Sequence, residues 1–156
     1  MEKSGHSPEI YDPNRIALSI RQPWAELILR GIKTIEVRRT PARPMGSVYL
    51  YTSKRTSSSP ELDSRLRQYG IDPETLPRGV IVGTVDILES RRSQESDASA
   101  AQLSPEHLAG TYSWVVGNAV RFPTPLPVEF VPFGTWFYPF QRKQTNVRHR
   151  RNHGGV

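Results

Sequence analysis

One stretch near the start of the chain, residues 18–38, constrains the fold more than any other. It reads LSIRQPWAELILRGIKTIEVR and opens with an apolar-polar-apolar alternation, which predicts a half-buried strand over residues 16–20. A proline suited to the first turn of a helix follows, and apolar residues then recur at helical spacing, which predicts a helix over 23–30. Gly31 lies where a left-handed residue ends a helix, and renewed alternation predicts a second strand over 33–39.

The rest of the chain alternates between short apolar runs and turn signals. A serine before a proline and a later glycine predict a helix over 60–69, capped by Ser59 and closed by Gly70. The polar segment 89–102 is typical of an exposed loop, and Gly117-Asn118 is typical of a turn. Further strands are predicted over 47–51, 79–88, 112–116, 119–122, 128–131 and 136–140. Many short strands with few helices favour a small barrel over a doubly wound sheet.

The opening stretch also carries a family signature. It contains a QPWA-like helix start followed by G-x-K-x-x-E-x-R, here Gln22-Pro23-Trp24-Ala25, then Gly31, Lys33, Glu36 and Arg38. In this it resembles the ASCH domain family, and most of all the C-terminal domain of activating signal cointegrator proteins. The resemblance covers most of residues 16–140. It implies an α+β fold, a small PUA-like β-barrel of about five to seven strands with two or three flanking helices.

Composition is consistent with one domain of this kind. The chain has 156 residues, no cysteine, and no apolar run of the length that crosses a membrane. Its first residues lack an apolar core, so we expect no secretory signal and a cytoplasmic protein without membrane contact. We expect a flexible arm over 1–15, the ASCH domain over 16–140, and a basic disordered tail over 141–156.

The net charge of +6 is concentrated in that tail. The tail has no acidic residue and carries five of the positive charges, Arg142, Lys143, Arg148, Arg150 and Arg151. Such a segment attracts phosphate backbones without sequence preference, and it serves equally well as a solubilising end. Both interpretations remain open at this stage.

The candidate site follows from the family signature. The resemblance implies a basic cleft that binds nucleic acid through matched positions and neighbouring cations, Lys33, Glu36, Arg38, Lys54, Arg55 and Arg21. An arginine can donate two parallel hydrogen bonds to one phosphate, and a carboxylate can accept a hydrogen bond from the amino group of a base. Regular alternation places Lys33 on the apolar face of its strand, whereas a twist near Gly31 brings it to the mouth of the cleft. The alternative is an ion pair of Glu36 with Lys33 or Arg38 on a solvated face.

RNA is the expected partner, with DNA and a modified nucleoside as the other ligands to consider. The family also contains small hydrolases, in which Lys33 and Glu36 would be the catalytic residues. Lys33 matches the lysine of acetylcytidine amidohydrolases, but Glu36 stands where those enzymes have threonine. In a ribonuclease, Glu36 would be the general base. The four histidines are scattered, so we expect no metal site, and no nucleotide-cofactor motif appears.

Aromatic residues near the end of the domain permit two interpretations. They are Phe130, Phe133, Trp136, Phe137 and Phe140. Residues of this kind usually fill a core or cover the end of a barrel, which is the interpretation we favour, and the alternative is base stacking. Trp24 and Trp114 are expected to be largely buried.

Overall fold

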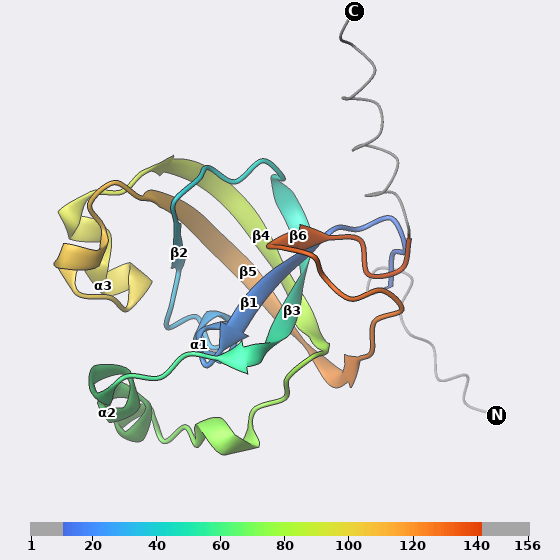
Figure 1. Cartoon of the computed structure of the whole chain (residues 1–156), viewed down its shortest axis with the longest axis horizontal. Helices are drawn as coiled ribbons and strands as arrows, with labels where there is room; N and C mark the ends of the chain where they lie inside the picture. Colours follow the sequence, from blue (N-terminus) through green and yellow to red (C-terminus); the bar gives the residue numbers. More distant parts are fainter. Residues whose placement is uncertain (1–10, 142–156) are drawn as a thin grey trace, which may run out of the picture.

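The computed structural model describes residues 11–141, in which a six-stranded sheet curls into a partly open barrel (Figure 1). The strands are β1 (Ala17–Gln22), β2 (Ile35–Arg38), β3 (Gly46–Thr56), β4 (Ile81–Arg92), β5 (Tyr112–Leu126) and β6 (Trp136–Phe137). Their order in the sheet is β2-β5-β4-β3-β1-β6. Three helices flank it, α1 (Trp24–Leu29), α2 (Pro60–Tyr69) and α3 (Ala98–Ala101). The predicted α+β barrel with flanking helices is confirmed.

The opening strand-helix-strand unit forms as its sequence predicts. β1 pairs with β3 in parallel, and α1 buries Leu27 and Ile28 on its apolar face. Gly31 has a φ of +72°, the left-handed conformation expected after a helix. Trp24 is partly buried and packs against the core, which agrees with the expectation that it is largely buried. Trp114 is buried, with 2% of its surface exposed.

β4 and β5 are long antiparallel strands that bend the sheet into a barrel. Their register shifts at three places, and each shift is a bulge or irregularity that bends and twists the strands. One shift lies at Asn118 and Ala119, which together oppose Val85 alone. The predicted turn at Gly117-Asn118 is therefore wrong. Asn118 does adopt a left-handed φ of 51°, but a bulge uses that conformation as readily as a turn does, and the strand continues through it.

The polar segment 89–102 is also not the exposed loop that its composition predicts. β4 continues to Arg92, and α3 then buries Ala98 and Ala101. Asp97, which is 5% exposed, accepts hydrogen bonds from Arg91 (2.7 Å), the Gln94 amide (2.9 Å) and Ser113 (2.9 Å). The Arg91 hydrogen bond is the main cause that holds the pKa of Asp97 well below its usual range. Asp97 thus caps and cross-links the backbone here instead of facing water, whereas Gln94, Glu95 and Ser96 are exposed.

The C-terminal strands are shorter than predicted. No strand forms over 128–131, where the Glu129 and Phe130 amides donate to the Pro139 carbonyl oxygen (3.0 and 3.1 Å). The loop before β6 folds back and brings its tip toward β2 (Figure 1). This fold-back turns the end of the domain toward the open side of the barrel.

The helix α2 and the N-terminal segment complete the domain. The Ser59 hydroxyl accepts from the Leu62 amide (3.1 Å) and Gly70 has a φ of +68°, so the predicted caps of α2 are confirmed. Asp12, in the segment predicted to be a flexible arm, exchanges hydrogen bonds of 2.6 and 2.8 Å with the buried Tyr49 hydroxyl. Residues 1–10 of that arm lie outside the described residues. None of the described helices is long and apolar enough to cross a membrane.

A close approach between β4 and β5 at Gly83 makes a testable prediction. A Cβ atom added to Gly83 of β4 would lie 2.0 Å from the Val120 carbonyl oxygen of β5, so the backbone would have to move. We expect Gly83→Ala to lower the free energy of unfolding by about 1–3 kcal/mol, measured by urea denaturation. Gly134→Ala is the control, because nothing lies within 4 Å of its added Cβ. Equal unfolding midpoints for the two variants would contradict this packing.

Candidate functional site

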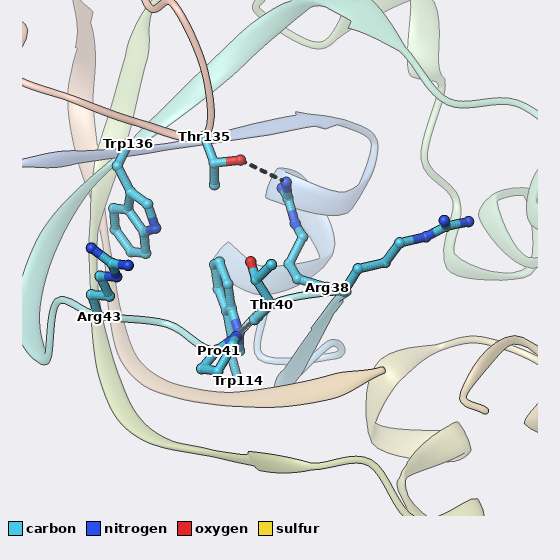
Figure 2. Close-up of a pocket in the computed structure, with 8 residues that line it drawn as sticks. Arg38, Thr40, Pro41, Arg43, Trp114, Thr135 and Trp136 are labelled. Carbon is cyan, nitrogen blue, oxygen red and sulfur yellow. Dashed lines mark hydrogen bonds between the residues drawn. The ribbon is translucent and has the colours of Figure 1, made fainter. Parts of the chain in front are cut away.

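Arg38 joins the two open edges of the sheet. It lies at the end of β2, whereas β1 and β6 occupy the opposite edge. Its guanidinium group donates to the Ser19 carbonyl oxygen of β1 (3.2 Å) and to the Thr135 hydroxyl just before β6 (3.3 Å), as Figure 2 shows for Thr135. The same group lies 5.7 Å from the centre of the Trp114 ring. A side chain, rather than a backbone ladder, thus bridges the gap between the two edges of the sheet. We call this gap the barrel seam.

A cavity of about 690 Å³ lies at this seam. Its walls come from the end of β2, the loop after it, β5, and the segment that enters β6 (Figure 2). The lining residues are Arg38, Arg39, Thr40, Pro41, Arg43, Trp114, Thr135 and Trp136. A volume of this size accommodates a small organic ligand or one nucleotide unit.

Two tryptophans form the aromatic wall of the cavity. Trp114 and Trp136 stack with ring centres 5.5 Å apart and an angle of 22° between their planes. The Trp114 indole N–H donates to the Thr40 carbonyl oxygen (2.9 Å), which fixes the inner ring. A flat ligand cannot enter between rings already in contact. Trp136, which is half-buried, is therefore the ring that can receive a stacked ligand.

Two arginines at the cavity are exposed and uncommitted. Among residues 11–141, the side chains of Arg39 and Arg43 have neither an ion pair nor a hydrogen bond, in contrast to Arg38. No acidic side chain in the described part of the chain lines the cavity with them. The mouth thus presents positive charge that is free to bind an anion.

Lys33, which we expected among the residues of the binding cleft, does not line this cavity. Its side chain is buried, with the ammonium group 2.6 Å from the Ala101 carbonyl oxygen of α3 and 4.7 Å from the centre of the Trp24 ring. The Glu36 carboxylate lies 3.7 Å away. Burial lowers the pKa of Lys33, and the Glu36 charge opposes that shift. The position of Lys33 fits a regular strand, whose alternation turns the side chain toward the apolar face. It does not fit a twist that would turn the side chain toward the mouth of the cleft.

Glu36 is the centre of a buried charge network rather than an exposed residue at the surface. It is 7% exposed, and its carboxylate accepts from the Val37 amide (3.1 Å) and from Arg38 (3.3 Å). With Lys33 on the other side, Glu36 holds two cations in place. The ion-pair alternative is therefore present, but it is enclosed rather than solvated. By holding Arg38 in place, this carboxylate helps to position the side chain that bridges the barrel seam.

The other predicted cations lie apart from the cavity. Arg21, Lys54 and Arg55 are exposed at the ends of β1 and β3, where Gln22 pairs with Thr56, and none of them lines the cavity. The predicted tail cations, Arg142, Lys143, Arg148, Arg150 and Arg151, lie outside the described residues. Among the predicted site residues that lie within 11–141, the structure brings Arg38 alone to the cavity wall and places Glu36 directly behind it.

Sequence reasoning missed most of the cavity. Arg39 and Arg43 follow the family signature directly, so a cluster of arginines beside a predicted strand end was the available signal. Trp136 was recognised as aromatic, but base stacking was the less favoured interpretation. No local sequence pattern links Trp114 with Trp136, because the two rings come together only through the curl of the sheet. Within residues 11–141, no group of three or more histidine, cysteine, aspartate or glutamate residues is arranged to hold a metal.

The buried lysine predicts a specific pH dependence. Because the unfolded chain holds the Lys33 proton more tightly, the free energy of unfolding should rise with pH between the lowered pKa and the ordinary value of 10.5. Lys33→Met should lack this rise, as measured by urea unfolding at a series of alkaline pH values. Lys54→Met, which replaces an exposed lysine, should retain it. Parallel profiles for wild type and Lys33→Met would contradict the burial of this charge.

Comparison with known proteins agrees with this architecture. Activating signal cointegrator 1 from Homo sapiens and from Mus musculus are each 28% identical to this chain over 96 residues. That alignment covers 57% of this chain and 16% of the relative, so this chain matches a small part of a longer protein.

Solved structures show the same fold. The crystal structure of ASCH from Zymomonas mobilis aligns with a TM-score of 0.56 and 14% identity, covering 90% of this chain and 96% of that one. A mutant form of the same protein aligns with a TM-score of 0.55 and 14% identity, covering 92% and 99%. The model of the ASCH domain matches residues 18–125, which is more than half of the sequence. This protein therefore belongs to the ASCH domain family.

Proposed function

We propose that this protein binds nucleic acid, RNA in the first instance, in the cavity at the barrel seam. The observation that carries the proposal is the pairing of two uncommitted arginines, Arg39 and Arg43, with an accessible tryptophan in one cavity. A nucleotide has the complementary pair of features, a charged phosphate and a flat base. Membership of the ASCH family, whose fold is PUA-like, supports the same assignment.

Each group at the cavity has a distinct part in this proposal. Arg39 and Arg43 bind phosphate, because guanidinium groups pair well with phosphate oxygens. Trp136 stacks on a base, and Thr40 offers a hydroxyl that can donate or accept at a base edge. Arg38 is already committed to the seam, so its role is to position Thr135 and the segment that carries Trp136.

The cations outside the cavity add an electrostatic contribution. Arg21, Lys54 and Arg55 are exposed, and the tail carries five further positive charges. We propose that both groups attract the phosphate backbone in a way that salt screens and that does not depend on base sequence. Discrimination between bases belongs to the cavity, where a ring and polar groups meet the base.

Hydrolysis, the alternative function, receives no support from the placement of its expected residues. The Lys33 ammonium is buried and hydrogen-bonded to Ala101, and Glu36 is held between two cations. A nucleophile or general base must reach the reacting atoms of its substrate. The cavity is lined by cations, hydroxyls and rings, which are groups suited to holding a ligand. We therefore propose binding.

The salt dependence of binding tests this proposal. Arg39→Gln with Arg43→Gln should weaken binding of oligouridine and reduce the slope of log affinity against log salt by about 1.4, at about 0.7 for each phosphate contact. Fluorescence anisotropy at several salt concentrations measures that slope. Arg67→Gln is the matched control, because Arg67 is an exposed arginine on α2 and does not line the cavity. Equal slopes for the double variant and the control would exclude the cavity as the phosphate site.

A further inference from the structure

Phe133 is the most exposed large apolar side chain in the described part of the chain. Its side chain is 83% exposed, and it lies in the loop between β5 and β6. The next residue, Gly134, has open space around the position of an added Cβ. A phenylalanine ring exposed to this extent is available to contact a molecule outside the domain.

The loop carries this ring close to the cavity. Phe133 precedes Thr135 by two residues, so their Cα atoms are at most about 7 Å apart. Thr135 lines the cavity and is fixed there, because its carbonyl oxygen accepts from the Ser19 amide (2.8 Å) and its hydroxyl accepts from Arg38 (3.3 Å). A short, anchored segment therefore carries an exposed phenylalanine within two residues of the cavity wall and within three of Trp136.

We propose that Phe133 is a second stacking platform, so that the site takes at least two consecutive unpaired nucleotides of a single strand. This inference rests on the proposed function. One base stacks on Trp136 and the next stacks on Phe133, while Arg39 and Arg43 hold the connecting phosphates. Paired bases inside a duplex cannot offer their faces to two rings in this way, so the arrangement selects single strands.

A single strand fits this ring better than an apolar protein partner does. The uncommitted charge at the neighbouring cavity is positive, which complements phosphate. A protein surface would also cover Val131, which is 59% exposed in the same loop. Base stacking engages the flat face of an aromatic ring and gains little from a valine. Val131 therefore separates the two kinds of contact and supplies a matched control.

The experiment compares two ligands of equal length and charge. One is oligouridine of about eight nucleotides, and the other is an abasic ribose-phosphate oligomer that keeps the phosphates and lacks the bases. Phe133→Ala should weaken binding of oligouridine by about 5- to 150-fold, the range expected for loss of one stacked base, and leave the abasic oligomer unaffected. Phe133→Tyr should bind like wild type, and so should Val131→Ala. Because Phe133 is exposed, thermal unfolding should be unchanged in all variants.

Two results would overturn this inference while leaving the proposed function in place. In the first, Phe133→Ala binds oligouridine as wild type does, while Trp136→Ala loses the preference for oligouridine over the abasic oligomer. In the second, Phe133→Ala keeps its RNA affinity and loses self-association in sedimentation, which would assign the ring to contact between copies. Equal binding of both oligomers by the wild type would exclude any base contact, so this inference and the base stacking proposed for Trp136 would both fail.

Discussion

The bridge that Arg38 makes across the barrel seam is the interaction on which the site depends. β2 and β6 are the two outermost strands of the sheet, so no backbone ladder joins them. Arg38 spans the gap by donating to the Ser19 carbonyl and the Thr135 hydroxyl. This bridge leaves a cavity beside it and fixes the segment that carries Trp136. The arginine of the family signature thus has a structural role here, and it shapes the wall of the proposed binding cavity.

That bridge is supported by charges that are costly to bury alone. Glu36 lies between Lys33 and Arg38, and all three belong to the family signature. Removing one partner of a buried ion pair typically costs about 3–5 kcal/mol, because the other charge is left uncompensated. The network therefore accepts little change at these positions. It also explains why the charged residues of the family signature pair with one another inside the domain, while Arg39 and Arg43, farther along the chain, face the solvent.

Local patterns predicted local structure well and the site less well. The strand-helix-strand opening and the caps of α2 follow from neighbours in sequence, and both were predicted. The bulge at Asn118 was not, since a left-handed residue suits both a turn and a bulge, and only strand pairing distinguishes them. Segment 89–102 misled because its mostly polar composition does not distinguish a loop from the end of a strand and a short helix, and only buried Asp97 and two alanines connect it to the interior. The stacked pair of Trp114 and Trp136 depends on curvature over the whole sheet, which no short pattern encodes.

The most direct test of the account is a titration of the protein with oligouridine, followed through the indole N–H signals of its three tryptophans by NMR. Trp136 and its stacked neighbour Trp114 line the cavity, whereas Trp24 contacts the buried Lys33 and does not line it. The account predicts that the signals of Trp136 and Trp114 shift with ligand and that the signal of Trp24 does not. Binding that leaves the Trp136 and Trp114 signals unmoved would contradict it.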